Sequence, residues 1–124
     1  GFRANDPLFR LSQLKIQLRT ITNAIIDQAI HVDGMTEEQM MRFLTETAFQ
    51  EEREAAGKWR RAQISYTQLS TYFVGFQEHL ETRAESQRRA GASFNLKAYH
   101  DGVLSFGSPP GRFARQLLLE EPIQ

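Results

Sequence analysis

The stretch DPLFRLSQLKIQLRTITNAIIDQAI, residues 6–30, decides the fold class. It opens with a helix start, because Asp6 can cap the free N–H groups of a first turn and Pro7 suits the first helical position. Apolar residues then recur at steps of three and four, which predicts a long helix with one main apolar stripe: Leu11, Leu14, Leu18, Ile21, Ile25 and Ala29. Ile16 and Ile26 fall to one side of this stripe, so we expect a central helix that is buried on more than one face.

Helical signals continue along the chain. Thr36 and Gln39 form a capping box, which predicts a second helix from Thr36 to about Ala48. The charged stretch 50–63 is helix-prone around Trp59, but Gly57 weakens it, so we expect a break or a short third helix.

The second half of the chain carries three more start and stop signals. A fourth helix is predicted from Ser65 or Tyr66 to Gly91. Asn95 is placed to cap a fifth helix, and the stretch 108–110, Ser-Pro-Pro, starts a sixth. No segment alternates at period two between turn signals. We therefore predict an all-α bundle of five to six helices, with residues 1–124 as one helical domain or a fragment of a longer protein.

Composition excludes several classes of protein. Lys plus Arg equals Asp plus Glu at 15 each, so the positive footprint of a nucleic-acid binder is missing. There is no cysteine, which excludes disulfides and thiolate zinc sites. No apolar run approaches the roughly 20 residues of a membrane span. The chain starts at Gly1 rather than at Met, from which we expect a processed chain or an excised segment.

The motifs of complete catalytic sites are missing from the sequence. No His is followed by Glu, so the zinc-peptidase helix motif is absent, and neither a nucleophile elbow nor a phosphate-binding glycine loop occurs. The three histidines, His31, His79 and His100, are too dispersed to predict a three-ligand metal site.

Two polar rows are the candidate functional features. On the first helix, Asn23, Asp27 and His31 follow one another at steps of four, so the carboxylate could orient the imidazole as in catalytic or metal sites. The alternative is a histidine favoured by the helix C-terminus beside a routine neighbour.

The second row lies on the predicted fourth helix. Gln68, Tyr72, Gly75 and His79 are spaced by four, three and four, so they would share one stripe. The alternatives are a boundary aromatic at Tyr72, a close helix contact at Gly75 and a surface histidine at His79. His100 reads more simply as a packing or hydrogen-bonding residue.

Three segments, NAIIDQAIHVDGMTEEQM, QLSTYFVG and FNLKAYHDGVLSFGSPP, resemble in order and spacing the C-terminal part of the bacterial domain of unknown function 885 family. The resemblance spans about Asp6 to Leu119. Members of that family are several times longer, largely helical and often exported or lipid-anchored. They carry upstream a His-Glu motif that makes them similar to helical zinc peptidases.

The resemblance implies that two motifs of the family align with segments of this chain. The family's Asp-x-Gly-Ile-His falls on 27–31, with Ala29 in place of the Gly, and an Arg usual before it falls on Asn23. The family's Pro-Gly-Gln-Ala-x-Ser-Tyr-x-x-Gly falls on 66–75, where Tyr66-Thr67 replace Pro-Gly and Thr71 replaces Ser. Gln68, Tyr72 and Gly75 match. In related zinc peptidases a C-terminal Tyr or His donates to the oxyanion, which implies such a role for Tyr72, with His31 on the same wall.

Two functions follow as expectations. The first is the C-terminal segment of a metal-dependent, peptidase-like hydrolase, with Tyr72 and His31 as catalytic candidates and Gln68, Asp27, Gly75 and His100 in substrate-binding or supporting roles. This chain would hold no cofactor itself, zinc belonging to the parent protein. The expected partners are the N-terminal catalytic half, a peptide substrate, and a second copy through an exposed docking face around Tyr72 and His31. The second function is a stand-alone helical binding module without catalysis.

Overall fold

The computed structural model describes residue 3 and residues 5–122, and these are all-α. Six α-helices follow one another: α1 (Pro7–His31), α2 (Glu37–Arg42), α3 (Glu52–Ile64), α4 (Thr71–Ala90), α5 (Leu96–Ser105) and α6 (Gly111–Leu119). A π-helical turn, Phe43–Thr47, extends α2, and a 3-10 turn, Gly91–Ser93, follows α4. No strand occurs in the described part of the chain, which confirms the predicted fold class.

Local capping explains the starts of α1, α2 and α5. The Asp6 carboxylate accepts hydrogen bonds from the backbone N–H groups of Leu8 and Phe9, at 3.0 and 3.1 Å. Thr36 and Gln39 form the predicted capping box. The Asn95 side chain accepts from Ala98 N at the start of α5. Each of these signals acts within a few residues, which is why the sequence predicts them.

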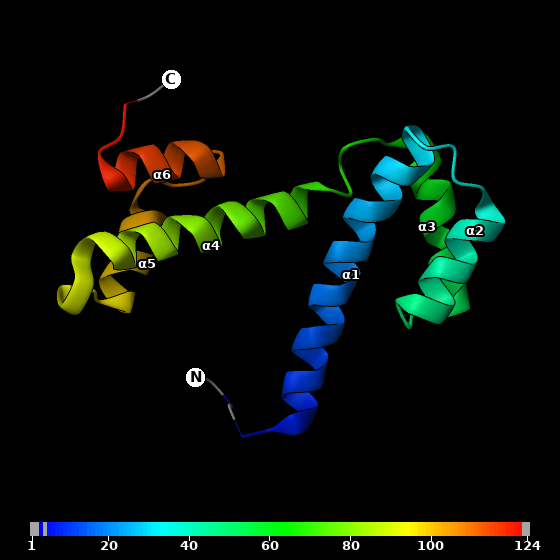
Figure 1. Cartoon of the computed structure of the whole chain (residues 1–124), viewed down its shortest axis with the longest axis horizontal. Coiled ribbons are helices and arrows are strands. Elements are labelled where there is room, and N and C mark those ends of the chain that lie inside the picture. Colours follow the sequence, from blue (N-terminus) through cyan, green and yellow to red (C-terminus); the bar gives the residue numbers. More distant parts are fainter. Residues whose placement is uncertain (1–2, 4, 123–124) are drawn as a thin grey trace. The chain divides into compact units, whose positions relative to one another are not determined.

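The chain divides into two compact units, Gly1–Phe73 and Val74–Gln124, and each has its own packing. In the first, α2 and α3 lie side by side against the C-terminal part of α1 (Figure 1). The core of this unit consists of seven buried residues: Ile26, Met40, Leu44, Ala48, Ala55, Ala62 and Leu69. Trp59 packs against this core as a partly buried residue. Of the two predicted alternatives, a break or a short third helix, the structure has the helix: α3 runs through Gly57 without a break.

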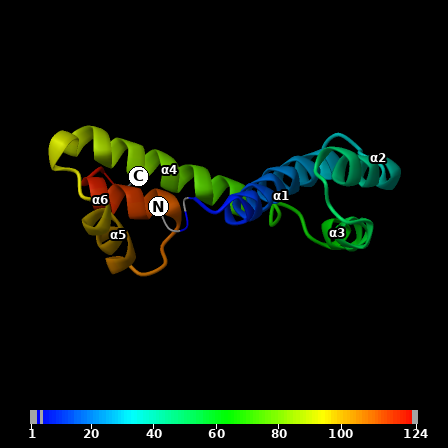
Figure 2. The same cartoon turned by 90° about the horizontal axis from the view of Figure 1, so that it is seen from below.

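The second unit is built from the later part of α4 with α5 and α6 (Figure 2). Tyr99 is its buried aromatic residue, and its hydroxyl donates to the carbonyl oxygen of His79 at 3.3 Å. The ring of Phe94 lies 6.1 Å from that of Tyr99, which is the apolar contact across a helix start that stabilises the entry of the chain. Ala114 is the buried residue of α6, whereas Leu117 remains exposed.

Two expectations about burial and boundaries are wrong. Most of the main stripe of α1 is not buried by the described residues: Ala29 is its buried member, and the buried side chains of the helix all lie between Thr22 and Ala29. Helix α4 begins at Thr71, not at Ser65 or Tyr66. Gln68 therefore lies in the turn before the helix and does not share a helical stripe with Tyr72. The turn before α4 is held by hydrogen bonds to the side chain of Asp27.

Candidate functional site

Asp27 is the centre of the candidate site, and it is almost completely buried, with 3 % of its surface exposed. Its Oδ1 accepts a hydrogen bond from the backbone N–H of Thr67 at 3.0 Å. Its Oδ2 accepts from both the backbone N–H and the hydroxyl of Ser70, at 3.0 and 2.7 Å. A carboxylate on α1 thus holds both ends of the turn that precedes α4, supplying acceptors that the turn's own backbone does not provide.

His31 lies one turn further along α1, at its C-terminal end. Its Nε2 is 3.9 Å from Asp27 Oδ1, which is too long for a hydrogen bond and becomes an ion pair only when the imidazole is protonated. The ring instead packs edge-on against Tyr66, with the ring centroids 5.9 Å apart. Asp27 therefore orients the turn that carries Tyr66, and Tyr66 in turn contacts His31.

These contacts surround an open hollow of about 340 Å³. Val32 and Tyr66 give it apolar surface, and the imidazole of His31 supplies ring nitrogens that can form hydrogen bonds. The complete lining is Asp27, Gln28, His31, Val32, Tyr66, Thr67 and Ser70. The structure thus brings two of the candidates, Asp27 and His31, to one place.

The other candidates lie elsewhere. Tyr72 is in the first turn of α4 with 67 % of its surface exposed, and it does not line the hollow. The Gln68 Oε1 accepts from an Arg61 guanidinium N–H at 3.4 Å. A Cβ placed on Gly75 would meet no described atom within 4 Å, so the predicted close helix approach is not made by these residues. His100, in the second unit, is exposed and lies edge-on to Tyr99 at 5.3 Å.

No metal centre is formed by the residues that the structure describes. Among residue 3 and residues 5–122, no group of three His, Asp or Glu side chains is arranged to hold a metal ion. Over the same residues, no helix combines the length and the apolar character needed to cross a bilayer.

A family model described as bacterial protein of unknown function (DUF885) matches residues 1–118. The chain belongs to this family. A solved structure of a putative lipoprotein of unknown function from Shewanella oneidensis is 44% identical, with a TM-score of 0.91 over 96% of this chain. The match covers 22% of that protein, so the DUF885 chain spans about a fifth of its length. Comparison with curated proteins gives no match.

One strained position lies beside the hollow. Thr67 has φ +64°, in the left-handed region that glycine adopts readily and that a β-branched residue adopts at a cost. The turn geometry would therefore suit a glycine, and the hydrogen bond from the Thr67 N–H to Asp27 holds the threonine in it.

The sequence did not reveal a second polar cluster, around Lys58 on α3. Lys58 is buried, and its ammonium donates to the side-chain oxygen of Gln50 and lies 3.4 Å from a Glu54 carboxylate oxygen. The Gln50 amide in turn donates to the Thr22 hydroxyl on α1 at 3.0 Å. Burial lowers the pKa of Lys58, while Glu54 opposes that shift. Lysine is almost never fully buried, so nothing in the sequence marked it.

Proposed function

We propose that this chain is the C-terminal helical segment of a peptidase-like, metal-dependent hydrolase and that it supplies substrate and transition-state contacts. The observation that carries the proposal is the hollow beside His31, whose wall is fixed by the three hydrogen bonds that Asp27 accepts. A positioned histidine next to apolar surface suits contact with a peptide side chain and its backbone carbonyl. The metal chemistry would belong to the parent protein.

Tyr72 has the second role in this proposal. Its phenol is exposed on the first turn of α4, so the hydroxyl can donate a hydrogen bond to a bound group. A donor of this kind stabilises an oxyanion only when it is held in place before the reaction. The Asp27 contacts with Thr67 and Ser70 fix the turn immediately before Tyr72 and so restrict where the hydroxyl can point.

The cellular location is part of the same proposal. The Shewanella oneidensis relative is described as a putative lipoprotein, and the two chains are 44% identical over the matched region. We extend export or lipid anchoring to the protein that contains this chain.

A binding module without catalysis is the second candidate. It is favoured by the number of large apolar side chains that the described residues leave exposed, among them Leu11, Tyr66 and Tyr72. A peptidase assay of the full-length protein with His31→Gln distinguishes the two functions. The hydrolase proposal predicts a loss of turnover or a raised KM with an unchanged melting temperature. A wild-type protein that binds peptides without cleaving them would support the binding module.

A further inference from the structure

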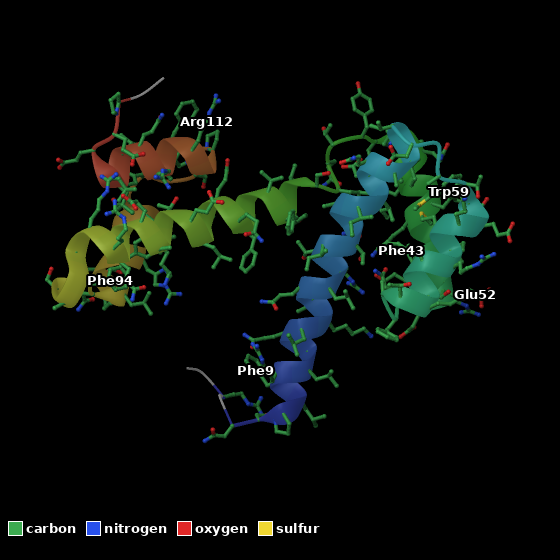
Figure 3. The ribbon with its side chains drawn as sticks, in the orientation of Figure 1. Phe9, Phe43, Glu52, Trp59, Phe94 and Arg112 are labelled. Atoms are coloured by element: carbon green, nitrogen blue, oxygen red, sulfur yellow. The ribbon has the colours of Figure 1, made fainter. Side chains whose placement is uncertain are left out.

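Helix α1 presents an apolar stripe whose side chains the described residues leave exposed, apart from Leu18, which is half-buried. Leu11 and Leu14 are 62% and 45% exposed, and Ile21 and Ile25 remain 42% and 45% exposed. Figure 3 shows Phe9 at the start of this helix, far from Phe43 and Trp59 beside the core of the same unit. We name the stripe the α1 seam and define it by Leu11, Leu14, Leu18, Ile21 and Ile25.

The seam has the spacing of a coiled coil rather than that of a general surface helix. Its members alternate steps of three and four, which are the a and d positions of a heptad. The buried side chains of α1, such as Thr22 and Ile26, lie on a neighbouring face. The helix therefore has one face for its own core and a separate face with the pattern for another helix.

The charges beside the seam define that other helix. Residues 7–26 contain Arg10, Lys15 and Arg19 and no acidic residue. Arg19 pairs with Glu54 at 2.6 Å, whereas neither Arg10 nor Lys15 has a carboxylate partner among the described residues. Arg10 and Lys15 occupy the g and e positions that flank the seam, where partner helices place opposite charges.

A second copy of this chain is a poor occupant for the same reason. In a parallel pair, residues at g and at the following e face each other, so Arg10 of one copy would oppose Lys15 of the other. In an antiparallel pair, the absence of acids between positions 7 and 26 leaves no ion pair to form. Like charges across a helix interface act against association.

We infer that the α1 seam binds an amphipathic helix with a leucine-rich stripe flanked by Asp or Glu, contributed by a part of the longer DUF885 protein outside these 124 residues. The matched relative supports this source, because the chain corresponds to only 22% of it. The inference does not depend on hydrolase activity. It assigns the main docking surface to α1, separate from the hollow beside His31.

Two synthetic helices test the charge pattern. Both carry Leu at a and d, and one has Glu at e and g where the other has Lys. We expect the chain to bind the Glu peptide at least tenfold more tightly, as measured by calorimetry. Arg10→Glu combined with Lys15→Glu should reverse the preference. Equal binding of the two peptides, or binding of neither, would overturn the inference.

Matched substitutions locate the binding on the helix. Leu14→Ser should weaken binding of the Glu peptide at least tenfold, whereas Ile16→Ser, on the opposite side of α1 and 64% exposed, should change it less than twofold. Circular dichroism checks that both variants stay helical. If Leu14→Ser binds as the wild type does, the seam is not the site.

The alternative occupants of the α1 seam would give distinct results. Sedimentation that shows a dimer abolished by Leu14→Ser would identify a second copy as the occupant. The chain has no cysteine, so an environment-sensitive dye on Leu14→Cys reports this position alone. We expect a solvated dye that becomes buried when the Glu peptide is added. A dye already buried in the monomer would show that the α4–α6 part of the chain covers the seam, against our inference.

Discussion

Asp27 and Ser70 are joined by two hydrogen bonds, from the serine N–H at 3.0 Å and its hydroxyl at 2.7 Å, although 43 positions separate them in sequence. This contact fixes where α4 can begin. An N-cap side chain accepts from the first turn of its own helix, whereas Asp27, on α1, accepts from Thr67 and Ser70 in the turn before α4. The turn that shapes the hollow is thus held by tertiary structure, and its stability depends on one buried carboxylate.

Removing that carboxylate should destabilise the first unit. Asp27→Ala leaves the N–H groups of Thr67 and Ser70 without their acceptor, so we expect a loss of about 2–4 kcal/mol in the free energy of unfolding. Ser70→Ala removes only the hydroxyl donor and should cost about 1 kcal/mol. Urea unfolding followed by circular dichroism measures both. Similar losses for the two variants would mean that the backbone contacts contribute little.

Thr67→Gly should stabilise the protein. Thr67 has φ +64°, and a non-glycine residue in this region costs roughly 1–2 kcal/mol. Part of the gain is offset because glycine has more freedom in the unfolded chain, so we expect a net increase of about 0.5–1 kcal/mol. Val32→Gly is the control, because Val32 is also exposed but has φ −111°. It should lose stability, and a loss in both variants would exclude strain at Thr67.

Replacing the buried amide of Gln50 should lower the free energy of unfolding more than replacing an exposed amide. Gln50→Leu removes the acceptor of the Lys58 ammonium and the donor to Thr22, leaving a buried charge with poorer solvation. We expect a loss of about 2–4 kcal/mol in denaturant unfolding. Gln63→Leu makes the same chemical change at an exposed position of α3 and should stay within about 0.5 kcal/mol of the wild type.

Acid should weaken the second unit through Glu85. Hydrogen bonds from Arg88 and Arg89 lower the pKa of this carboxyl from 4.5 to about 2. A lowered pKa in the folded state means a stabilising contribution that is present above pH 4.5 and lost as the pH falls toward about 2. NMR titration of the Glu85 carboxyl carbon measures the shift. Arg88→Gln should raise the pKa, and an unchanged midpoint would show that the ion pairs do not persist in solution.

The sequence predicts those parts of this fold that local chemistry determines. The caps at Asp6, Thr36 and Asn95 act within three residues, so the helices they start were predicted. The start of α4 was not, because the turn before it is held by Asp27, which is about forty positions away. The apolar period of the α1 seam predicted burial, but periodicity says only that a stripe needs a partner and not that the partner lies within these residues.

The candidate site shows the same division between local and distant causes. Spacing placed Asp27 and His31 one turn apart on α1, and the structure keeps both beside the hollow. The three hydrogen bonds that engage the Asp27 carboxylate come from a distant turn and could not be read from its neighbours. The sequence marked Tyr66 as a helix start and as a departure from the family motif, not as a site residue, yet its ring contacts His31.

A comparison of Tyr72→Phe with Tyr99→Phe distinguishes a catalytic hydroxyl from a structural one. In the full-length protein, Tyr72→Phe keeps the exposed ring and removes only the donor, so the melting temperature should hardly change. If the hydroxyl stabilises an oxyanion, turnover should fall by about 100-fold to 1,000-fold with a much smaller change in KM. Tyr99→Phe is the matched control, because its buried hydroxyl donates to the His79 carbonyl at 3.3 Å. That variant should lose about 1 kcal/mol of stability and keep its turnover. Near-normal turnover of Tyr72→Phe, or a loss that follows unfolding, would make Tyr72 an ordinary surface aromatic.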